Sequence, residues 1–181
     1  MRKRVTSLTA AFILIAVSLA FAETGGAVIR GTEKGAKRVG LAWFRDTEQG
    51  LQVIARLKNL APGKHGFHFH QFGYCGEKGL NAGDHFNPAG APHGSLLKNG
   101  FGGAHAGDLG NIEVGPDGRG TLDIVIPGLS LSGGQYSVGG RSLVVHAKED
   151  DFGQPAGNAG ARIGCGTIFL VSEADWKEKG K

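Results

Sequence analysis

Short stretches of alternating hydrophobic and polar residues recur along the chain, a pattern typical of β-strands with one buried face. The clearest is Leu51–Leu57, in which Leu, Val, Ala and Leu occupy the odd positions and Gln, Ile and Arg the even ones. A turn-like segment, Asp46–Gly50, precedes it and predicts a hairpin. A second hairpin is predicted where Asn111–Val114 and Gly120–Ile126 flank Gly-Pro-Asp-Gly at positions 115–118.

Eight short strands are expected in all. They are Gly26–Gly31, Arg38–Phe44, Leu51–Leu57, His65–His70, Asn111–Val114, Gly120–Ile126, Ser142–Ala147 and Gly166–Val171. Glycine supplies 33 of the 181 residues without a collagen period, and long helical patterns are scarce. The pattern therefore predicts an all-β domain, built as an antiparallel sandwich or barrel with many turns.

Two long segments without a clear pattern separate these strands, Gln71–Gly110 and Lys148–Ile163. Loops of such length in a compact domain are usually either functional or disordered. The first contains more than half of the candidate metal ligands described below, which favours a functional role.

The first 22 residues have the composition of an export signal, with Arg2, Lys3 and Arg4 ahead of the apolar run Leu8–Ala20. We expect cleavage after Ala22, which leaves a single domain over residues 23–181. An uncleaved membrane anchor is the alternative, but the run is short and no stop-transfer pattern follows. The signal holds three of the 20 basic residues and no acidic residue, so the remaining 159 residues carry 17 Lys plus Arg against 16 Asp plus Glu. The basic character of the whole chain is thus no argument for nucleic-acid binding, and no membrane association is expected after cleavage.

Only two cysteines are present, Cys75 and Cys165. In an exported chain an isolated pair predicts one disulfide, and two unrelated thiols are the alternative.

The segment His65–His70 combines two functions on one predicted strand. His68 and His70 share one face, whereas Phe67 and Phe69 share the other and can fill the core. A His-x-His pair alone is weak evidence for a metal, because two polar residues on the exposed face of a strand are common. His65 has the parity of the phenylalanines, so we interpret it as a structural, hydrogen-bonding histidine.

The remaining histidines strengthen the case for metal binding. His85, His93, His105 and Asp108 supply three imidazoles and a carboxylate, which are ligand types of a tetrahedral zinc site. Imidazole-only ligation by the strand pair and His146 suits copper, which favours nitrogen donors and supports one-electron chemistry. Six of the seven histidines fall into this pattern.

With these residues in place, the chain resembles the copper,zinc superoxide dismutases over nearly the whole of residues 23–181. The stretches that carry the resemblance are Gly66–Gly73 (Gly-Phe-His-Phe-His-Gln-Phe-Gly), His85–Pro88, Gly107–Asn111, Gly140–His146 and Gly157–Gly166 (Gly-Asn-Ala-Gly-Ala-Arg-Ile-Gly-Cys-Gly). The resemblance implies an eight-stranded antiparallel Greek-key barrel or sandwich with two long functional loops. Copper would be bound by His68, His70, His85 and His146, and zinc by His85, His93, His105 and Asp108.

The resemblance also implies roles for further residues. Asp150 would connect a copper-bound and a zinc-bound histidine and fix both rings. Arg162 would guide the superoxide anion to copper. The implied reaction is the disproportionation of superoxide into dioxygen and hydrogen peroxide, in which the bridging imidazole of His85 takes up a proton as copper is reduced.

Some positions depart from the family. The segment before Arg162 is short and carries Gly153–Ala156 (Gly-Gln-Pro-Ala) where many relatives have charged residues, which implies weaker electrostatic guidance. Ser95–Phe101 is somewhat apolar and can be ordinary packing, which we favour, or a subunit contact. We expect Ala174–Lys181 to be a solvated end.

Two other functions compete with an enzyme. A metal-binding module of the same fold could hold or deliver copper or zinc, although it would be expected to lack a copper ligand or Arg162. A structural or adhesive sandwich domain would leave six histidines unexplained. For the enzyme we expect a homodimer, located in the periplasm or otherwise secreted.

Overall fold

The computed structural model describes residues 22–179. The predicted signal segment, 1–22, lies outside this range except for its last residue. Within residues 22–179, no helix is both long enough and apolar enough to cross a lipid bilayer.

Nine strands and three short helices make up the described chain. They are β1 Thr24–Gly31, β2 Arg38–Thr47, β3 Gly50–Leu57, β4 Gly63–His70, the 3-10 helix η1 Leu80–Ala82, α1 Leu96–Asn99, β5 Asp108–Val114, β6 Gly120–Ile126, β7 Ser142–His146, β8 Arg162–Thr167, β9 Phe169–Val171 and α2 Glu173–Lys179. The eight predicted strands are all present, and the two predicted loops become a first loop, residues 71–107, and a second loop, residues 147–161.

The last predicted strand is displaced and divided. It was expected at Gly166–Val171, but β8 begins four residues earlier, and a break at Ile168 separates it from β9. Ile168 causes the break because its backbone N–H donates to the carbonyl of Arg141, while its own carbonyl accepts from Gly140. Because β8 and β9 both pair with β1, they act as one interrupted strand of an eight-stranded barrel.

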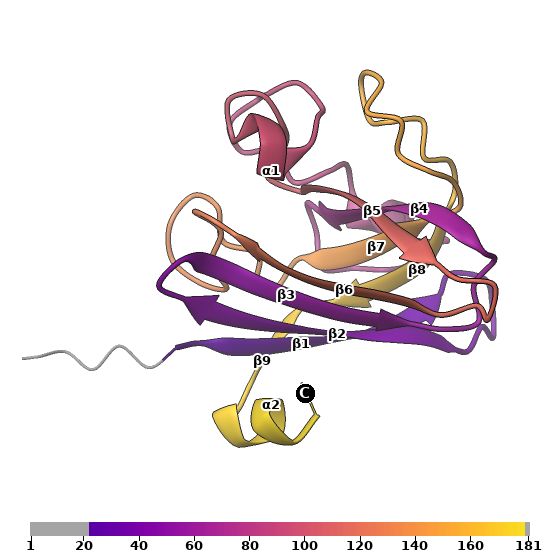
Figure 1. Ribbon diagram of the computed structural model, residues 1–181, viewed down its shortest axis with the longest axis horizontal. Helices are drawn as coiled ribbons and strands as arrows, with labels where there is room; N and C mark the ends of the chain where they lie inside the picture. Colours follow the sequence, from indigo (N-terminus) through magenta and orange to yellow (C-terminus); the bar gives the residue numbers. More distant parts are fainter. Residues whose placement is uncertain (1–21, 180–181) are drawn as a thin grey trace, which may run out of the picture.

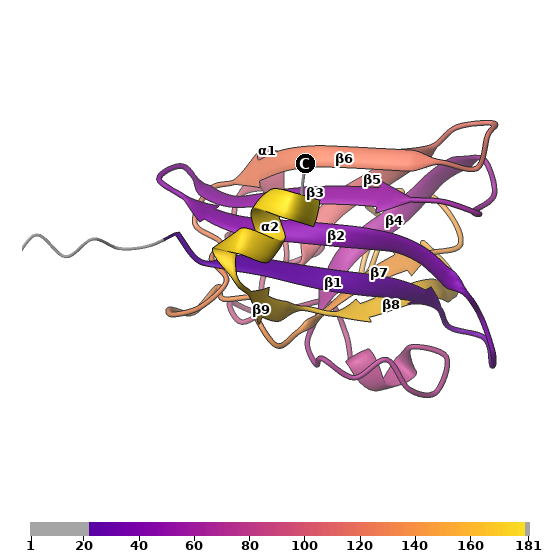
Figure 2. The same ribbon diagram turned by 90° about the horizontal axis from the view of Figure 1, so that it is seen from below.

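The sheet is antiparallel throughout and closes on itself. Its order is β2-β3-β6-β5-β4-β7-β8-β1, and pairing of β1 with β2 completes the barrel (Figures 1 and 2). Strands distant in sequence are neighbours, since β3 pairs with β6 and β4 lies between β5 and β7. This is the Greek-key arrangement expected from the resemblance.

Apolar side chains on alternate strand positions fill the barrel. Phe67 and Phe69 of β4 are fully buried, and the Phe69 ring lies 6.0 Å from that of Phe44 on β2. His68 and His70, on the opposite face of β4, are also fully buried because the long loops cover them. The predicted parity of this strand is therefore confirmed, and both of its faces are covered.

The ends of the fold show two packing details that the alternation pattern does not contain. Leu96 of α1 is buried, and the Phe101 ring stacks on Tyr136 at a centroid distance of 3.8 Å, in line with packing of Ser95–Phe101. The prediction of a solvated C-terminal end is wrong in part. Helix α2 lies against the barrel (Figure 2), where Trp176 is buried beneath the guanidinium of Arg45.

Candidate metal centre

Four histidines converge over one face of the paired strands β4 and β7. His68 and His70 lie on β4, and His146 is the last residue of β7. His85 comes from the first loop, where its backbone forms an isolated antiparallel β-bridge with that of His70. One ring nitrogen from each of the four lies within 4.8 Å of the other three. The structure thus brings together the four residues that the sequence predicted for copper.

A second group of ligands adjoins the first and shares one member with it. His85, His93 and His105 of the first loop and Asp108, the first residue of β5, place one ligand atom each within 4.8 Å of one another. His85 belongs to both groups, and its ring centroid lies 4.1 Å from that of His68. These four are the residues that the sequence predicted for zinc.

Both groups contain buried ring nitrogens that are free to bind a metal ion. Nδ1 of His68, His93 and His105 is buried without a hydrogen-bond partner. Nδ1 of His93 does lie 2.9 Å from an Asp108 oxygen, close enough for charge attraction, but the orientation is wrong for a hydrogen bond. Buried polar atoms are nearly always satisfied. Lone pairs from several imidazoles directed into one small space are what a metal cation satisfies.

Burial keeps three imidazoles of the first group neutral, those of His68, His70 and His146. It lowers the pKa of His70 to about 2, that of His146 to about 3 and that of His68 to about 4, and nearby positive groups add to the effect. Hydrogen bonding to Asp150 partly opposes the shift at His68. Neutral imidazole is the form that binds metals, so at neutral pH no proton competes strongly for these three ligands.

The second group has the opposite electrostatic character. Burial acts to lower the pKa of His93, but its contacts with Asp108 and Asp150 outweigh burial and raise it to about 9. Burial acts to raise the pKa of Asp108, but three imidazoles and the backbone N–H of Gly94 hold it far below its usual range. The carboxylates therefore favour positive charge among these imidazoles, which a proton or a dication can supply.

Asp150 connects the two groups. Its Oδ2 lies 2.8 Å from Nε2 of His68, and its Oδ1 lies 2.9 Å from Nε2 of His93. Donation from both Nε2 atoms leaves both Nδ1 atoms as acceptors directed at the sites, so the carboxylate fixes ring orientation and tautomer together.

Asn111 holds the backbone of Asp150 with both ends of its side-chain amide. Nδ2 of Asn111 donates to the Asp150 carbonyl at 2.9 Å, and the Asp150 N–H donates to Oδ1 of Asn111 at 2.7 Å. Sequence reasoning missed this contact, because a lone asparagine on a strand carries no sign of its partner 39 residues away.

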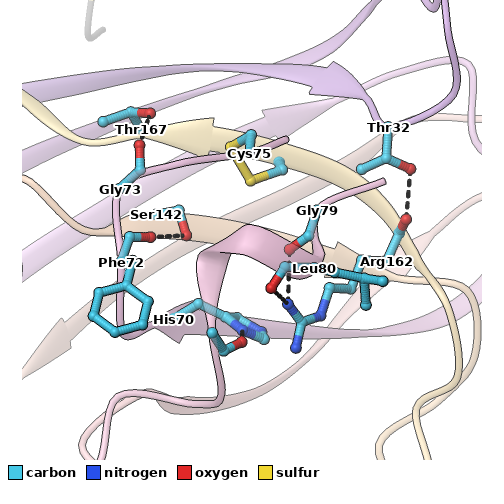
Figure 3. The surroundings of a disulfide bond; sticks show 12 residues. Thr32, His70, Phe72, Gly73, Cys75, Gly79, Leu80, Ser142, Arg162 and Thr167 are labelled. Carbon is cyan, nitrogen blue, oxygen red and sulfur yellow. Dashed lines mark hydrogen bonds between the residues drawn. A yellow bond between two sulfur atoms is a disulfide. The ribbon is translucent and has the colours of Figure 1, made fainter. Parts of the chain in front are cut away.

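Arg162, at the start of β8, is held by the first loop. Its Nη1 donates to the carbonyls of Gly79 at 2.7 Å and Leu80 at 3.3 Å. The Cys75–Cys165 disulfide ties that part of the loop to β8, as Figure 3 shows. The prediction of one disulfide is confirmed.

The guanidinium and two histidines of the first group line a common cavity of about 980 Å³. Arg162, His85 and His146 all line it, and residues of both long loops form its walls. Burial lowers the pKa of Arg162, with a partial opposing effect from Asp84, and the positive charge of Arg162 in turn lowers the pKa of His70 and His146. The cavity thus presents permanent positive charge beside the neutral imidazole of His146.

His65 stands apart from both groups, as predicted. Its Nδ1 lies 2.8 Å from the His146 carbonyl and its Nε2 lies 2.9 Å from that of Ala61. It supports the backbone of a candidate ligand without offering one itself.

Comparison with known proteins finds a matching family and several similar proteins. Residues 39–168 match the family described as copper/zinc superoxide dismutase. A Cu-Zn superoxide dismutase of Arabidopsis thaliana is 42% identical over 144 residues, covering 76% of this chain and 85% of the relative. An extracellular Cu-Zn superoxide dismutase of Caenorhabditis elegans is 42% identical over 142 residues, covering 75% of this chain and 62% of the relative. The crystal structure of a double mutant of a superoxide dismutase-like protein from Bacillus subtilis aligns with a TM-score of 0.71 and 34% identity, covering 80% of this chain and 96% of that one.

Proposed function

The chain belongs to the copper/zinc superoxide dismutase family, and we propose that it converts two superoxide ions and two protons into dioxygen and hydrogen peroxide. One observation carries this proposal above the others. Two complete ligand groups share His85, and His85 and His146 of the first group line the same cavity as the guanidinium of Arg162.

Each ligand group suits one of the two metals of the family. His68, His70, His85 and His146 would hold copper, because their donors are all imidazole nitrogens. His85, His93, His105 and Asp108 would hold zinc, because three imidazoles and one carboxylate match a closed tetrahedral site and the carboxylate balances part of the ion's charge. Bound copper supplies the one-electron redox chemistry of the reaction.

Side chains of the protein attract the superoxide anion and transfer a proton. Arg162 remains charged at all working pH values and attracts superoxide into the cavity, where field lines converge between protein walls of low dielectric constant. Formation of hydrogen peroxide consumes protons. His85 is the imidazole common to both groups, and its ring nitrogen on the copper side is placed to accept and deliver one of them.

Asp108 and Asp150 hold the histidine rings of the two groups in position. Asp108 Oδ1 lies 2.8 Å from Nδ1 of His85, and Asp150 joins His68 to His93. Both carboxylates are fully buried, so water does not compete for these contacts.

The protein is exported, as its disulfide and its extracellular relatives indicate, because disulfides persist in oxidising compartments. We propose more specifically that residues 1–22 are removed as a signal peptide and that the destination is the periplasm, with secretion as the alternative. A homodimer is the proposed assembly, and sedimentation of the purified protein would test it.

The deciding experiment is superoxide consumption by the protein lacking residues 1–22, loaded with copper and zinc. His146→Ala and a copper-free sample are the comparisons. We expect fast, copper-dependent removal that is lost in both comparisons. Stoichiometric metal binding without turnover would instead support a protein that carries metal.

A further inference from the structure

We infer that Gln154 is a positioning residue that latches the second loop onto the zinc-binding part of the first. Its side-chain amide contacts the backbone of His93 at both polar groups. Nε2 of Gln154 donates to the His93 carbonyl at 2.8 Å, and the His93 N–H donates to Oε1 of Gln154 at 3.1 Å. A single side-chain amide thus makes two hydrogen bonds to the His93 backbone, as a neighbouring β-strand would. The two residues lie 61 positions apart in the chain.

Three residues at alternate positions of the second loop contact His93. Asp150 accepts from Nε2 of the ring, Phe152 stacks near the ring face at a centroid distance of 6.4 Å, and Gln154 holds the backbone. The His93 side chain is fully buried, whereas Gln154 is exposed, so the latch closes over the ligand from the solvent side. The second loop therefore holds both the ring and the backbone of this ligand.

The latch completes a chain of contacts that begins in the barrel. Asn111 of β5 pairs with the backbone of Asp150 in the same two-way manner, and Asn87 does so with Ala91 inside the first loop. Asn111 thus anchors the start of the second loop, and Gln154 anchors its tip. Figure 1 shows the second loop and the part of the first loop around α1 rising from the same side of the barrel.

The latch also joins the two loops that line the cavity. Pro155 and Ala156, which follow Gln154, line the cavity together with Asn87 and Pro88 of the first loop. Loss of the latch would remove no metal ligand and would not alter Arg162, but it would let His93 move with the first loop. We therefore expect its main effect on how long the second metal is retained, not on which ligands bind it.

This inference rests on the proposed function for the identity of the second metal as zinc. The variants are Gln154→Ala, which removes both bonds, and Gln154→Glu, whose carboxylate can still accept from the His93 N–H but cannot donate to its carbonyl. Gln52→Ala is the matched control, because Gln52 is also a surface glutamine with one amide bond, to Asp123 on the far strand pair β3 and β6.

The first readout is the rate of zinc release from each loaded protein into an excess of chromogenic chelator. Partners that orient a ligand are worth about 10–100-fold in metal affinity, and an exposed latch belongs at the lower end. We expect release about tenfold faster from Gln154→Ala, an intermediate rate from Gln154→Glu, and the wild-type rate from Gln52→Ala.

The second readout is hydrogen exchange of backbone amides in the same proteins without metal. The His93 amide should exchange faster in Gln154→Ala but stay protected in Gln154→Glu, while the Asp150 amide, bonded to Asn111, stays protected in all. Wild-type exchange at His93 in Gln154→Ala, or zinc release no faster than from the control, would overturn the latch. If the wild-type protein takes up no zinc, the proposed function fails, and exchange at His93 still decides whether the latch exists.

Discussion

Gly157 lies directly against the Asp150 carboxylate, with no room for a side chain between them. A Cβ atom at position 157 would overlap Oδ1 of Asp150 and would lie 2.6 Å from Nε2 of His93. The backbone φ of +76° also favours glycine here. Because any side chain at position 157 would displace the carboxylate, this glycine is required for Asp150 to reach both His68 and His93.

We therefore expect Gly157→Ala to damage both metal sites as well as the backbone. The unfavourable φ alone should cost about 1–3 kcal/mol of stability, and the displaced carboxylate should release both rings. Gly102→Ala is the control, because that glycine is in the first loop and has open space around its Cβ direction. The measurement is metal content after gel filtration, together with the melting temperature. Full metal content in Gly157→Ala would show that Asp150 does not orient the ligands.

Removing the guanidinium of Arg162 should slow the capture of superoxide. We expect Arg162→Ala to lower kcat/KM by at least about tenfold and to flatten its dependence on salt, because charge in a narrow cavity raises on-rates by about 10–1,000-fold. Arg119→Ala, in the exposed turn between β5 and β6, removes the same charge far from the cavity. Unchanged kinetics in Arg162→Ala, or an equal effect of Arg119→Ala, would remove the guiding role.

Loss of the disulfide should affect both stability and Arg162. The bond closes a span of 90 residues, for which the chain-entropy model gives about 4–5 kcal/mol. It also restrains the loop whose carbonyls at Gly79 and Leu80 hold the guanidinium. A protein with Cys75→Ser and Cys165→Ser should unfold at lower denaturant concentration and show reduced activity per bound copper. Equal free energies of unfolding would contradict the stabilising role.

Asp46 offers a test of pH-dependent stability away from the metals. Burial and the negative charge of Glu23 raise its pKa, although the N–H of Leu131 acts to lower it. A folded-state pKa above the unfolded value means that the contribution to stability is complete below the unfolded pKa and is lost as pH rises through the folded pKa.

We accordingly expect Asp46→Asn to be more stable than wild type at neutral pH. The difference should shrink below about pH 4, where the carboxyl is protonated in both states. An asparagine oxygen can still accept from Leu131, so the hydrogen bond at 2.9 Å need not be lost. Melting temperatures of the metal-free proteins at the two pH values, with the exposed Asp123→Asn as control, make the comparison. A gain that persists at low pH would point to a cause other than charge.

Strand alternation predicted the fold well where both partners of a strand follow the same pattern. The predicted strand Leu51–Leu57 differs from β3 by one residue, and the faces of Phe67 and His68 are as expected. The pattern failed at β8, because two of its six residues are glycines and the strand is ordered by pairing with β7. Local sequence cannot show pairing with a distant strand.

The candidate site was likewise predictable only in part. Side chains with distinctive chemistry, such as His85 and Asp108, could be selected from the sequence, and the resemblance assigned them to a site. Contacts made through backbone groups could not be selected, since Gln154 and Asn111 are ordinary amides until the fold brings His93 and Asp150 beside them. Trp176 was missed for a similar reason, because its partner Arg45 lies on a strand 131 positions earlier.

The position of α2 has an optical consequence. The chain contains two tryptophans, Trp43 on β2 and Trp176 on α2, and both are buried. Helix α2 lies on the side of the barrel opposite the second loop and α1 (Figure 1). Intrinsic fluorescence therefore reports the integrity of the barrel wall and its helix, while the loops around the histidines contain no indole fluorophore. Barrel unfolding and loop opening can thus be followed in one sample, the first by emission and the second by chelator colour.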